Sequence, residues 1–270
     1  MQDSIEHRKP ARVLLLGAFP RSVKCSVQSE VIPGVLITLM DTEAQTLAAL
    51  EQRVLPRLHP AEQQRYETFT HPLRRQTWLA GRALLLASLQ RQLGLVNVAA
   101  LRTDPDGGVR YSAADLRLSL SHSGELIAVA LSRRAVGVDI EWSRPRKLLQ
   151  RPGEVFSSSE AARLQALPES QRQDAFYTLW TLKEAACKAA GLSLWECLRS
   201  TSFDPANAAF SAEPPFPAGN WRFVSMQFSP HWFLGLATVS SLPIEIRRLD
   251  APDQWQPQTL SGQIELRQRQ

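Results

Sequence analysis

The stretch WTLKEAACK, from Trp180 to Lys188, lies in a segment without glycine or proline that runs from residue 174 to residue 190. The segment is rich in alanine and leucine, so it is predicted to be a helix. At helical spacing, four side chains are expected to share one face: Trp180, Lys183, Glu184 and Lys188. This face would place one carboxylate between two ammonium groups. An ordinary surface ion pair has the same pattern, so the helix alone does not decide the function.

A second motif lies upstream, in the sequence VGVDIE that begins at Val136. Hydrophobic residues alternate here with other residues, which predicts a strand whose Asp139 and Glu141 side chains point to the same face. Two neighbouring carboxylates repel each other unless a cation lies between them. With Glu184 they supply three oxygen ligands, the donor type that Mg²⁺ prefers together with substrate phosphates. The two motifs therefore predict a magnesium site, with the two lysines of the helix beside a bound phosphate.

The composition is that of an ordinary globular protein of 270 residues, with 44% hydrophobic and 21% charged residues. The net charge of +5 favours an acidic partner, such as nucleic acid, an anionic membrane, a polyphosphate or an acidic protein. Cys25, Cys187 and Cys197 have no C-x-x-C spacing, which argues against a disulfide framework and a zinc site. No hydrophobic run is long enough to cross a membrane, and we interpret the protein as cytoplasmic.

The predicted elements recur after about a hundred residues. Trp78 and Trp180 lie 102 residues apart in corresponding long helices, and Ile37 and Gly137 lie 100 residues apart in corresponding strands. We therefore predict an α+β fold of two similar subdomains related by a pseudo-twofold duplication. The predicted units are an N-terminal extension (1–33), a first α+β subdomain (34–134), a second one with the metal site (135–243) and a peripheral C-terminal tail (244–270). The helices are expected at 42–50, from residue 60, and at 73–93, 157–167 and 174–190.

The two motifs together resemble the signature of the 4′-phosphopantetheinyl transferases, in which GVDIE is followed by W-x-x-K-E-A-x-x-K. The pattern is similar to the long, single-chain type that activates peptide and polyketide synthases, the surfactin-synthetase-activating type. The resemblance covers roughly residues 35–239. It implies two subdomains related by a pseudo-twofold axis, with the active site in the cleft between them, and a monomeric protein.

The resemblance also implies the reaction. Phosphopantetheine is transferred from coenzyme A to a serine of an apo acyl or peptidyl carrier protein, with Mg²⁺ as cofactor, and adenosine 3′,5′-bisphosphate is released. The metal ligands would be Asp139, Glu141 and Glu184, and the phosphates would be held by Lys183 and Lys188. The expected catalytic residues are Glu184, Lys188 and Asp139, and either Glu184 or a metal-bound water removes the serine proton. Nucleic acid and membranes are not expected partners.

Further residues are assigned through the same resemblance. The sequence SHSG from Ser121 to Gly124 matches the family, which implies that His122 contacts the 3′-phosphate of coenzyme A with Ser121 beside it. The basic residues expected to complete this site are Arg65, Arg75 and Arg82. The family often has Gly-Lys-Pro before the Ser-His motif, whereas this chain has DGGVR, in which Arg110 is the candidate substitute. Trp180 is expected to pack beneath the site.

Two other functions fit the sequence. The basic charge is also typical of a nucleic-acid-binding protein, although no known RNA- or DNA-binding motif is present. A catalytically silent relative that binds carrier proteins would have the same fold, and the intact carboxylates and lysines argue against it. Taken singly, Asp139 could also cap a helix and Glu141 could be a solvated strand end.

Overall fold

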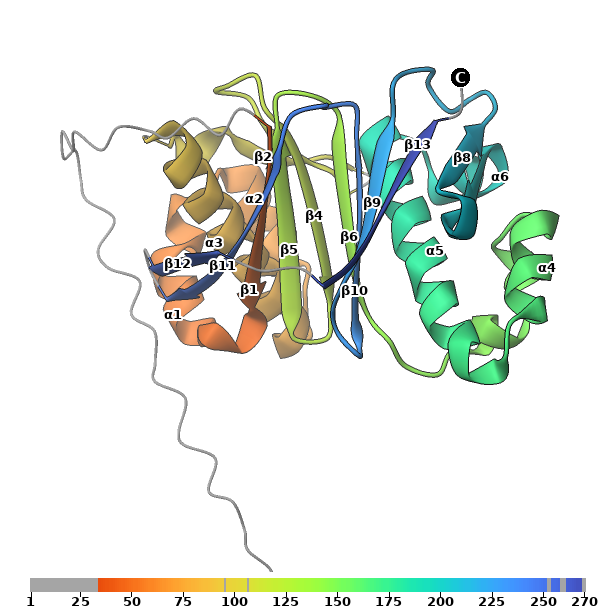
Figure 1. The fold of residues 1–270 in the computed structure, drawn as a ribbon. Helices are drawn as coiled ribbons and strands as arrows, with labels where there is room; N and C mark the ends of the chain where they lie inside the picture. The colour runs from red at the N-terminus through yellow and green to blue at the C-terminus, as the bar shows by residue number, and fades with distance from the viewer. Residues whose placement is uncertain (1–33, 95, 106, 252–253, 258–260, 269–270) are drawn as a thin grey trace, which may run out of the picture.

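The computed structural model describes residues 34–94, 96–105, 107–251, 254–257 and 261–268. Two β-sheets lie against each other between two groups of helices (Figure 1). This arrangement agrees with the predicted α+β class. The predicted N-terminal extension (1–33) lies outside the described residues. Within the described residues, no helix combines the length and hydrophobicity needed to span a membrane.

The five predicted helices occur in the predicted order as α1 to α5, and α6 was not predicted. The helices are α1 (Leu47–Arg53), α2 (Pro60–Glu67), α3 (Pro72–Leu93), α4 (Ser158–Ala166), α5 (Glu169–Ala190) and α6 (Leu194–Ser200). The strands are β1 (Val35–Asp41), β2 (Leu101–Thr103), β3 (Val109–Tyr111), β4 (Arg117–Ser123), β5 (Leu126–Ser132), β6 (Val136–Trp142), β7 (Thr201–Asp204), β8 (Ala209–Ala212), β9 (Arg222–Ser229), β10 (Trp232–Thr238), β11 (Ile244–Ala251), β12 (Gln254–Pro257) and β13 (Ser261–Gln268).

The predicted helix at 42–50 differs from the structure at its start. A short 3₁₀ helix at Thr42–Ala44 comes first, and α1 begins only at Leu47. The N-cap of α1 is Thr46, whose hydroxyl accepts a hydrogen bond from the backbone N–H of Ala49. The helix predicted at 157–167 matches α4 closely, and its N-cap is Ser157 in a capping box with Glu160.

The C-terminal segment is part of both sheets. The seven-stranded sheet has the order β12-β11-β1-β5-β4-β3-β2, and the six-stranded sheet has the order β6-β10-β9-β13-β8-β7. β11 pairs in parallel with β1, and β13 pairs antiparallel with β9. The prediction of a peripheral tail after Pro243 is therefore wrong for these strands. Their stability comes from backbone pairing with strands distant in the sequence, which local composition does not reveal.

Three hydrophobic clusters hold the layers together. One lies between α1–α3 and the first sheet, and a second lies between α4–α6 and the second sheet. The third joins the two sheets and includes Ile37 of β1, Val138 and Ile140 of β6, and Leu234 of β10. Because side chains alternate along a strand, the residue between Val138 and Ile140 in β6 points the other way, toward α5. This alternation places Asp139 on the helix-facing side of the second sheet.

Helix α5 packs directly on the backbone of the second sheet at two glycines. A Cβ atom on Gly137 of β6 would lie 2.0 Å from the carbonyl oxygen of Ala185, and one on Gly235 of β10 would lie 2.2 Å from that of Thr181. Both distances are far below a van der Waals contact, and the neighbouring atoms are backbone. The absence of a side chain at these two positions therefore sets how closely α5 approaches β6 and β10.

Replacement of Gly235 by alanine is expected to destabilise the protein. The added methyl group would push α5 away from β10. Overpacking typically costs about 1–3 kcal/mol, and the upper end is expected here because the clashing atoms are backbone. Gly153 is a matched control, because a Cβ there meets nothing within 4 Å. Chemical denaturation should show a loss of about 3 kcal/mol for Gly235→Ala and a change within about 0.5 kcal/mol for Gly153→Ala. Equal stability of the two variants would contradict the close approach.

Candidate active site

Asp139 is buried at the place where the two sheets meet. Its side chain is 7% exposed, and its Oδ1 atom accepts a hydrogen bond of 2.7 Å from the Ser121 hydroxyl of β4. The ammonium of Lys188 on α5 lies 2.8 Å from the same oxygen and also donates to the backbone carbonyl of Val138. Asp139 thus connects the first sheet, the second sheet and α5.

Glu141 is held through both of its carboxylate oxygens. Oε2 accepts hydrogen bonds from the Ser123 hydroxyl at 2.7 Å and from the Arg146 guanidinium at 2.8 Å. Oε1 accepts one from the indole N–H of Trp180 at 3.2 Å. Trp180 is 9% exposed and stacks on Phe176, so it packs beneath the site as expected and also bonds to a carboxylate.

Glu184 lies on α5 near both of these carboxylates, and its pKa is raised to about 7. The main cause is burial, which disfavours the ionised form, followed by the negative charge of Asp139. The charge of Glu141 raises the pKa further. Lys188 and Arg146 oppose these effects without cancelling them. The three predicted carboxylates are therefore close enough to affect one another electrostatically.

His122 lies on β4 beside the same group of charges. The residue is exposed, but nearby protein atoms desolvate the imidazole and lower its pKa below the ordinary value. The ammonium of Lys188 lowers the pKa further, and Asp139 partly opposes this effect. A phosphate bound near His122 would reverse the shift, because a negative charge favours the imidazolium.

The donors of this group suit a hard cation, although they do not form a finished metal site. In the part of the chain that the structure describes, no three His, Cys, Asp or Glu side chains are already arranged around a common metal position. The Oδ2 atom of Asp139 is nevertheless buried, and no described residue donates a hydrogen bond to it. A buried carboxylate oxygen without a donor is unfavourable, and a cation at this oxygen would relieve the cost. The oxygen donors therefore fit Mg²⁺.

Lys183 does not belong to this group, which corrects its predicted role in binding phosphate. Its side chain is fully buried, and its ammonium lies 3.1 Å from the Glu160 carboxylate of α4 and 2.6 Å from the carbonyl oxygen of Thr201. Five positions separate Lys183 from Lys188, which places them about 140° apart around the helix axis. The prediction that both lysines share a face is therefore wrong, and Lys183 instead packs α5 against α4 and β7.

The four predicted arginines lie in the first half of the chain, and each contacts a residue of the same half. Arg82 is 4% exposed, pairs with Glu62 and stacks over Trp78. Burial lowers its pKa to about 10. Since both sides of the guanidinium are occupied by protein, its predicted contact with coenzyme A is not retained. The other three are more accessible. Arg65 donates a hydrogen bond to the backbone carbonyl of Asp104, Arg110 forms an ion pair with the Asp104 carboxylate, and the Arg75 guanidinium lies 3.8 Å from the Glu51 carboxylate.

Two residues of the site are absent from the sequence prediction. Arg146 follows β6 in the sequence, and its 2.8 Å ion pair with Glu141 supplies positive charge beside the carboxylates. The repulsion expected between Asp139 and Glu141 was a signal that a nearby cation was needed, and Arg146 is five residues after Glu141. Ser123 lies within the SHSG motif, but the sequence assigned it no role, because its bond to Glu141 depends on how the two sheets meet.

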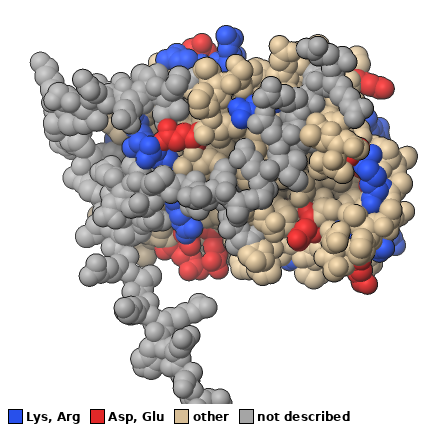
Figure 2. Space-filling model, in the orientation of Figure 1, with Lys and Arg blue, Asp and Glu red and all other residues tan. Residues whose placement is uncertain are grey.

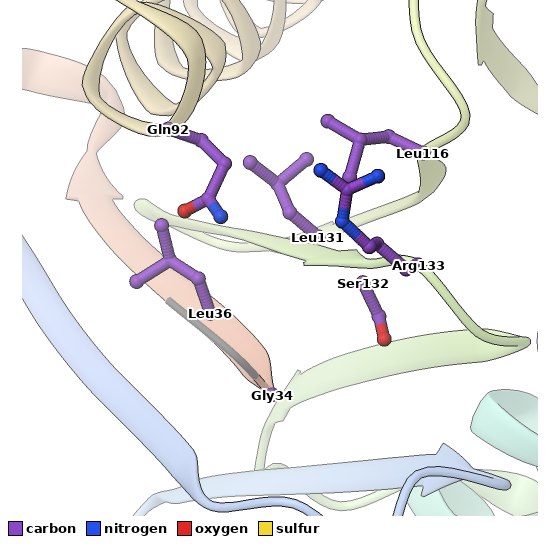
Figure 3. Close-up of a pocket in the computed structure, with 7 residues that line it drawn as sticks. All are labelled: Gly34, Leu36, Gln92, Leu116, Leu131, Ser132 and Arg133. Carbon is purple, nitrogen blue, oxygen red and sulfur yellow. The ribbon is translucent and has the colours of Figure 1, made fainter. Parts of the chain in front are cut away.

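Neither the charges on the face drawn in Figure 2 nor the small pocket near the start of β1 indicates where this site lies. Figure 2 shows Lys and Arg side chains interspersed with Asp and Glu side chains over the described part of one face. Figure 3 shows a pocket between α3, β1 and β5 that contains none of the predicted site residues. The residues that line it are Gly34, Leu36, Gln92, Leu116, Leu131, Ser132 and Arg133.

Comparison with known proteins gives a consistent result. A family model of the 4′-phosphopantetheinyl transferase superfamily matches residues 135–242, which include β6 and α5. The chain is 38% identical over 142 residues to the 4′-phosphopantetheinyl transferase AcpT of Salmonella typhimurium, a match that covers 52% of this chain and 71% of that protein. It is 33% identical to the 4′-phosphopantetheinyl transferase HetI of a Nostoc species, over 56% of this chain and 64% of that protein.

A lower similarity connects the chain to the 4′-phosphopantetheinyl transferase Sfp of Bacillus subtilis, with 26% identity over 53% of this chain and 64% of that protein. The matched relatives thus include differently named transferases. The motifs at Asp139–Glu141 and Trp180–Lys188, their position at one junction and these similarities lead to the same conclusion: the chain belongs to the 4′-phosphopantetheinyl transferase family and is an enzyme of this class.

Proposed function

We propose that this protein transfers 4′-phosphopantetheine from coenzyme A to a serine hydroxyl of an apo acyl or peptidyl carrier protein and releases adenosine 3′,5′-bisphosphate. Membership of the transferase family supports the reaction type. The observation that carries the proposal for this chain is the group of Asp139, Glu141 and Glu184 with Lys188, in which one buried carboxylate oxygen accepts no hydrogen bond from any described residue. Such a group suits a cation and a diphosphate together.

In this proposal Mg²⁺ is held by Asp139, Glu141 and Glu184. When bound, the ion polarises the phosphoryl oxygens and neutralises charge on the leaving group. Arg146 and Trp180 would keep Glu141 in place, because they donate hydrogen bonds to its two oxygens. The uncompensated Oδ2 atom of Asp139 supports its role as a ligand.

Two residues of α5 would act on the reactants. The Lys188 side chain is partly exposed. Its ammonium can therefore move from Asp139 to a phosphate of coenzyme A and keep a negatively charged partner. Glu184 is suited to accept the serine proton, since burial raises its pKa to about 7 in the metal-free protein and a carboxylate with a raised pKa is a stronger base than an ordinary one. His122 would receive the 3′-phosphate, together with the accessible arginines Arg65, Arg75 or Arg110.

We also infer that the two halves of the chain are related by duplication, with the substrate cleft between them. Each sheet contains the same succession of strands, β1-β5-β4-β3-β2 in one and β6-β10-β9-β8-β7 in the other, with β13 inserted between β9 and β8. Each half also has a 22-residue helix after its first strand, α3 or α5. The boundaries 34–134 and 135–243 follow from this correspondence, and it supports a monomer of the long, single-chain type.

The function is tested by intact mass spectrometry of an apo carrier protein incubated with the enzyme, coenzyme A and Mg²⁺. The carrier should gain one phosphopantetheine, and EDTA should abolish the gain. Asp139→Ala should slow the transfer by about 100-fold or more, because metal assistance is worth several kcal/mol in the transition state. Asp174→Ala, which removes an exposed carboxylate near the start of α5, should retain the wild-type rate.

The choice of carrier separates a narrow substrate range from a wrong proposal. Peptidyl, polyketide and fatty-acid carriers should each be tried with the wild-type protein. If none gains mass although one of them binds the protein, the chain is a non-catalytic relative. If Asp139→Ala matches the wild type, the proposed metal site is wrong.

Glu184→Gln is expected to stabilise the metal-free protein at high pH while it abolishes transfer. The folded state raises the Glu184 pKa to about 7, so ionised Glu184 disfavours folding. The cost is absent at acidic pH, where the carboxyl is protonated in both states, and is complete above pH 7. The variant should gain on the order of 2 kcal/mol of unfolding free energy at pH 8 and little near pH 4.5.

Chemical denaturation in EDTA at several pH values measures this effect. Glu213→Gln is the control, because Glu213 is exposed and lies outside the site. A Glu184→Gln protein that is less stable than the wild type at pH 8 would contradict the charge repulsion described here.

A further inference from the structure

We propose that Ser123 of β4 is a positioning residue that holds Glu141 of β6 in the orientation needed to bind the metal. The proposal rests on the proposed function, and it adds that the first sheet contributes hydroxyl groups that arrange the carboxylates of the second sheet. The observation that carries it is the 2.7 Å hydrogen bond from the Ser123 hydroxyl to Oε2 of Glu141.

Ser123 is one of three alternate serines on the same face of β4, and all three bond to β6. Ser119 accepts a hydrogen bond of 3.0 Å from the backbone N–H of Val138. Ser121 donates one of 2.7 Å to Asp139. These serines thus form the polar connection between the sheets, next to the hydrophobic cluster that joins them. Only the second and third of them reach carboxylates.

The direction of the Ser123 hydroxyl is fixed by a second hydrogen bond. Its oxygen accepts the backbone N–H of Trp142 at 3.1 Å, which leaves the O–H free to donate to Glu141. Since Trp142 is adjacent to Glu141 in β6, the serine holds both the backbone and the side chain at this position. A hydroxyl held in this way restricts the Glu141 side chain more than a freely rotating one would.

Glu141 needs this restraint because it lies close to other negative charges. It raises the pKa of Glu184, as Asp139 does, so repulsion favours a rotation of Glu141 away from the site. Arg146 also bonds to Oε2, but its side chain is 23% exposed and extends from the loop after β6. Trp180 holds only Oε1, so without Ser123 the Oε2 atom would be held by Arg146 alone and would turn with it toward solvent. Loss of a partner that orients a metal ligand typically weakens metal binding by about 10- to 100-fold.

The test compares Ser123→Ala with Ser119→Ala, which removes a hydroxyl of the same strand face that touches no carboxylate. Mn²⁺ serves as the probe, and electron paramagnetic resonance measures free Mn²⁺ in a titration. We expect Ser123→Ala to weaken Mn²⁺ binding about 10-fold and Ser119→Ala to change it less than about 2-fold. Ser123→Ala loses two hydrogen bonds between the sheets and Ser119→Ala loses one, so both variants should lose a few degrees of Tm in EDTA, with the larger loss for Ser123→Ala.

The Mg²⁺ dependence of carrier modification gives a second readout. The half-saturating Mg²⁺ concentration should rise for Ser123→Ala by the same factor as the Mn²⁺ dissociation constant, and excess Mg²⁺ should restore most of the rate. Ser123→Thr, which retains a hydroxyl, should restore binding. If Ser123→Ala does not fold, Ser123→Thr is compared with Ser123→Val instead. These two side chains have the same shape, and they differ only in that valine has a methyl group where threonine has the hydroxyl.

The outcomes distinguish this inference from the proposed function. Equal Mn²⁺ affinity of Ser123→Ala and Ser119→Ala, with wild-type binding intact, would overturn the positioning role alone. A wild-type protein that neither binds Mn²⁺ nor requires a divalent ion would overturn the proposed metal site and this inference together.

Discussion

The contact between α5 and the bare backbone of β6 and β10 determines where the site residues can lie. Gly137 and Gly235 leave no room for a Cβ atom, so the helix lies against the strands at the level of Thr181 and Ala185. Glu184 is one residue before Ala185, and Lys188 is three residues after it. The same contact therefore brings both side chains close to β6. Gly235 is also the direct strand partner of Asp139. One close approach therefore brings together the helix carboxylate, the lysine and the strand carboxylates.

The helix that supplies these groups is anchored on its other side by a separate ion pair. Lys183 and Glu160 are both fully buried, and the Glu160 carboxylate also accepts backbone hydrogen bonds from Ser157 and Phe203. Such a pair is costly to break, because the remaining charge would be buried without compensation. It therefore fixes the rotation of α5 about its axis. Glu184, the next residue after Lys183, is thereby oriented toward the charged side chains at the junction of the sheets.

The sequence allowed prediction of those parts of the site that depend on local periodicity. Alternation in β6 placed Asp139 and Glu141 on one face, and helical spacing brought Glu184 and Lys188 together. Lys183 was misplaced because a five-residue separation does not keep two side chains on one helix face. The bond from Ser123 to Glu141 connects strands of different sheets, and the pairing of β11 with β1 joins segments about two hundred residues apart. Contacts of this kind depend on tertiary structure, so local patterns do not indicate them.

The distribution of chemistry between the sheets explains why the site lies at their junction. β6 carries two carboxylates that would repel each other on an isolated strand, and the groups that offset this repulsion come from elsewhere in the chain. Lys188 and Trp180 come from α5, and the hydroxyls come from β4. Most of these groups pair with a carboxylate oxygen, yet Oδ2 of Asp139 has no hydrogen-bond donor among the residues that the structure describes. A fold that satisfied this oxygen as well would be more stable in itself, but would have less free energy to gain from a bound cation.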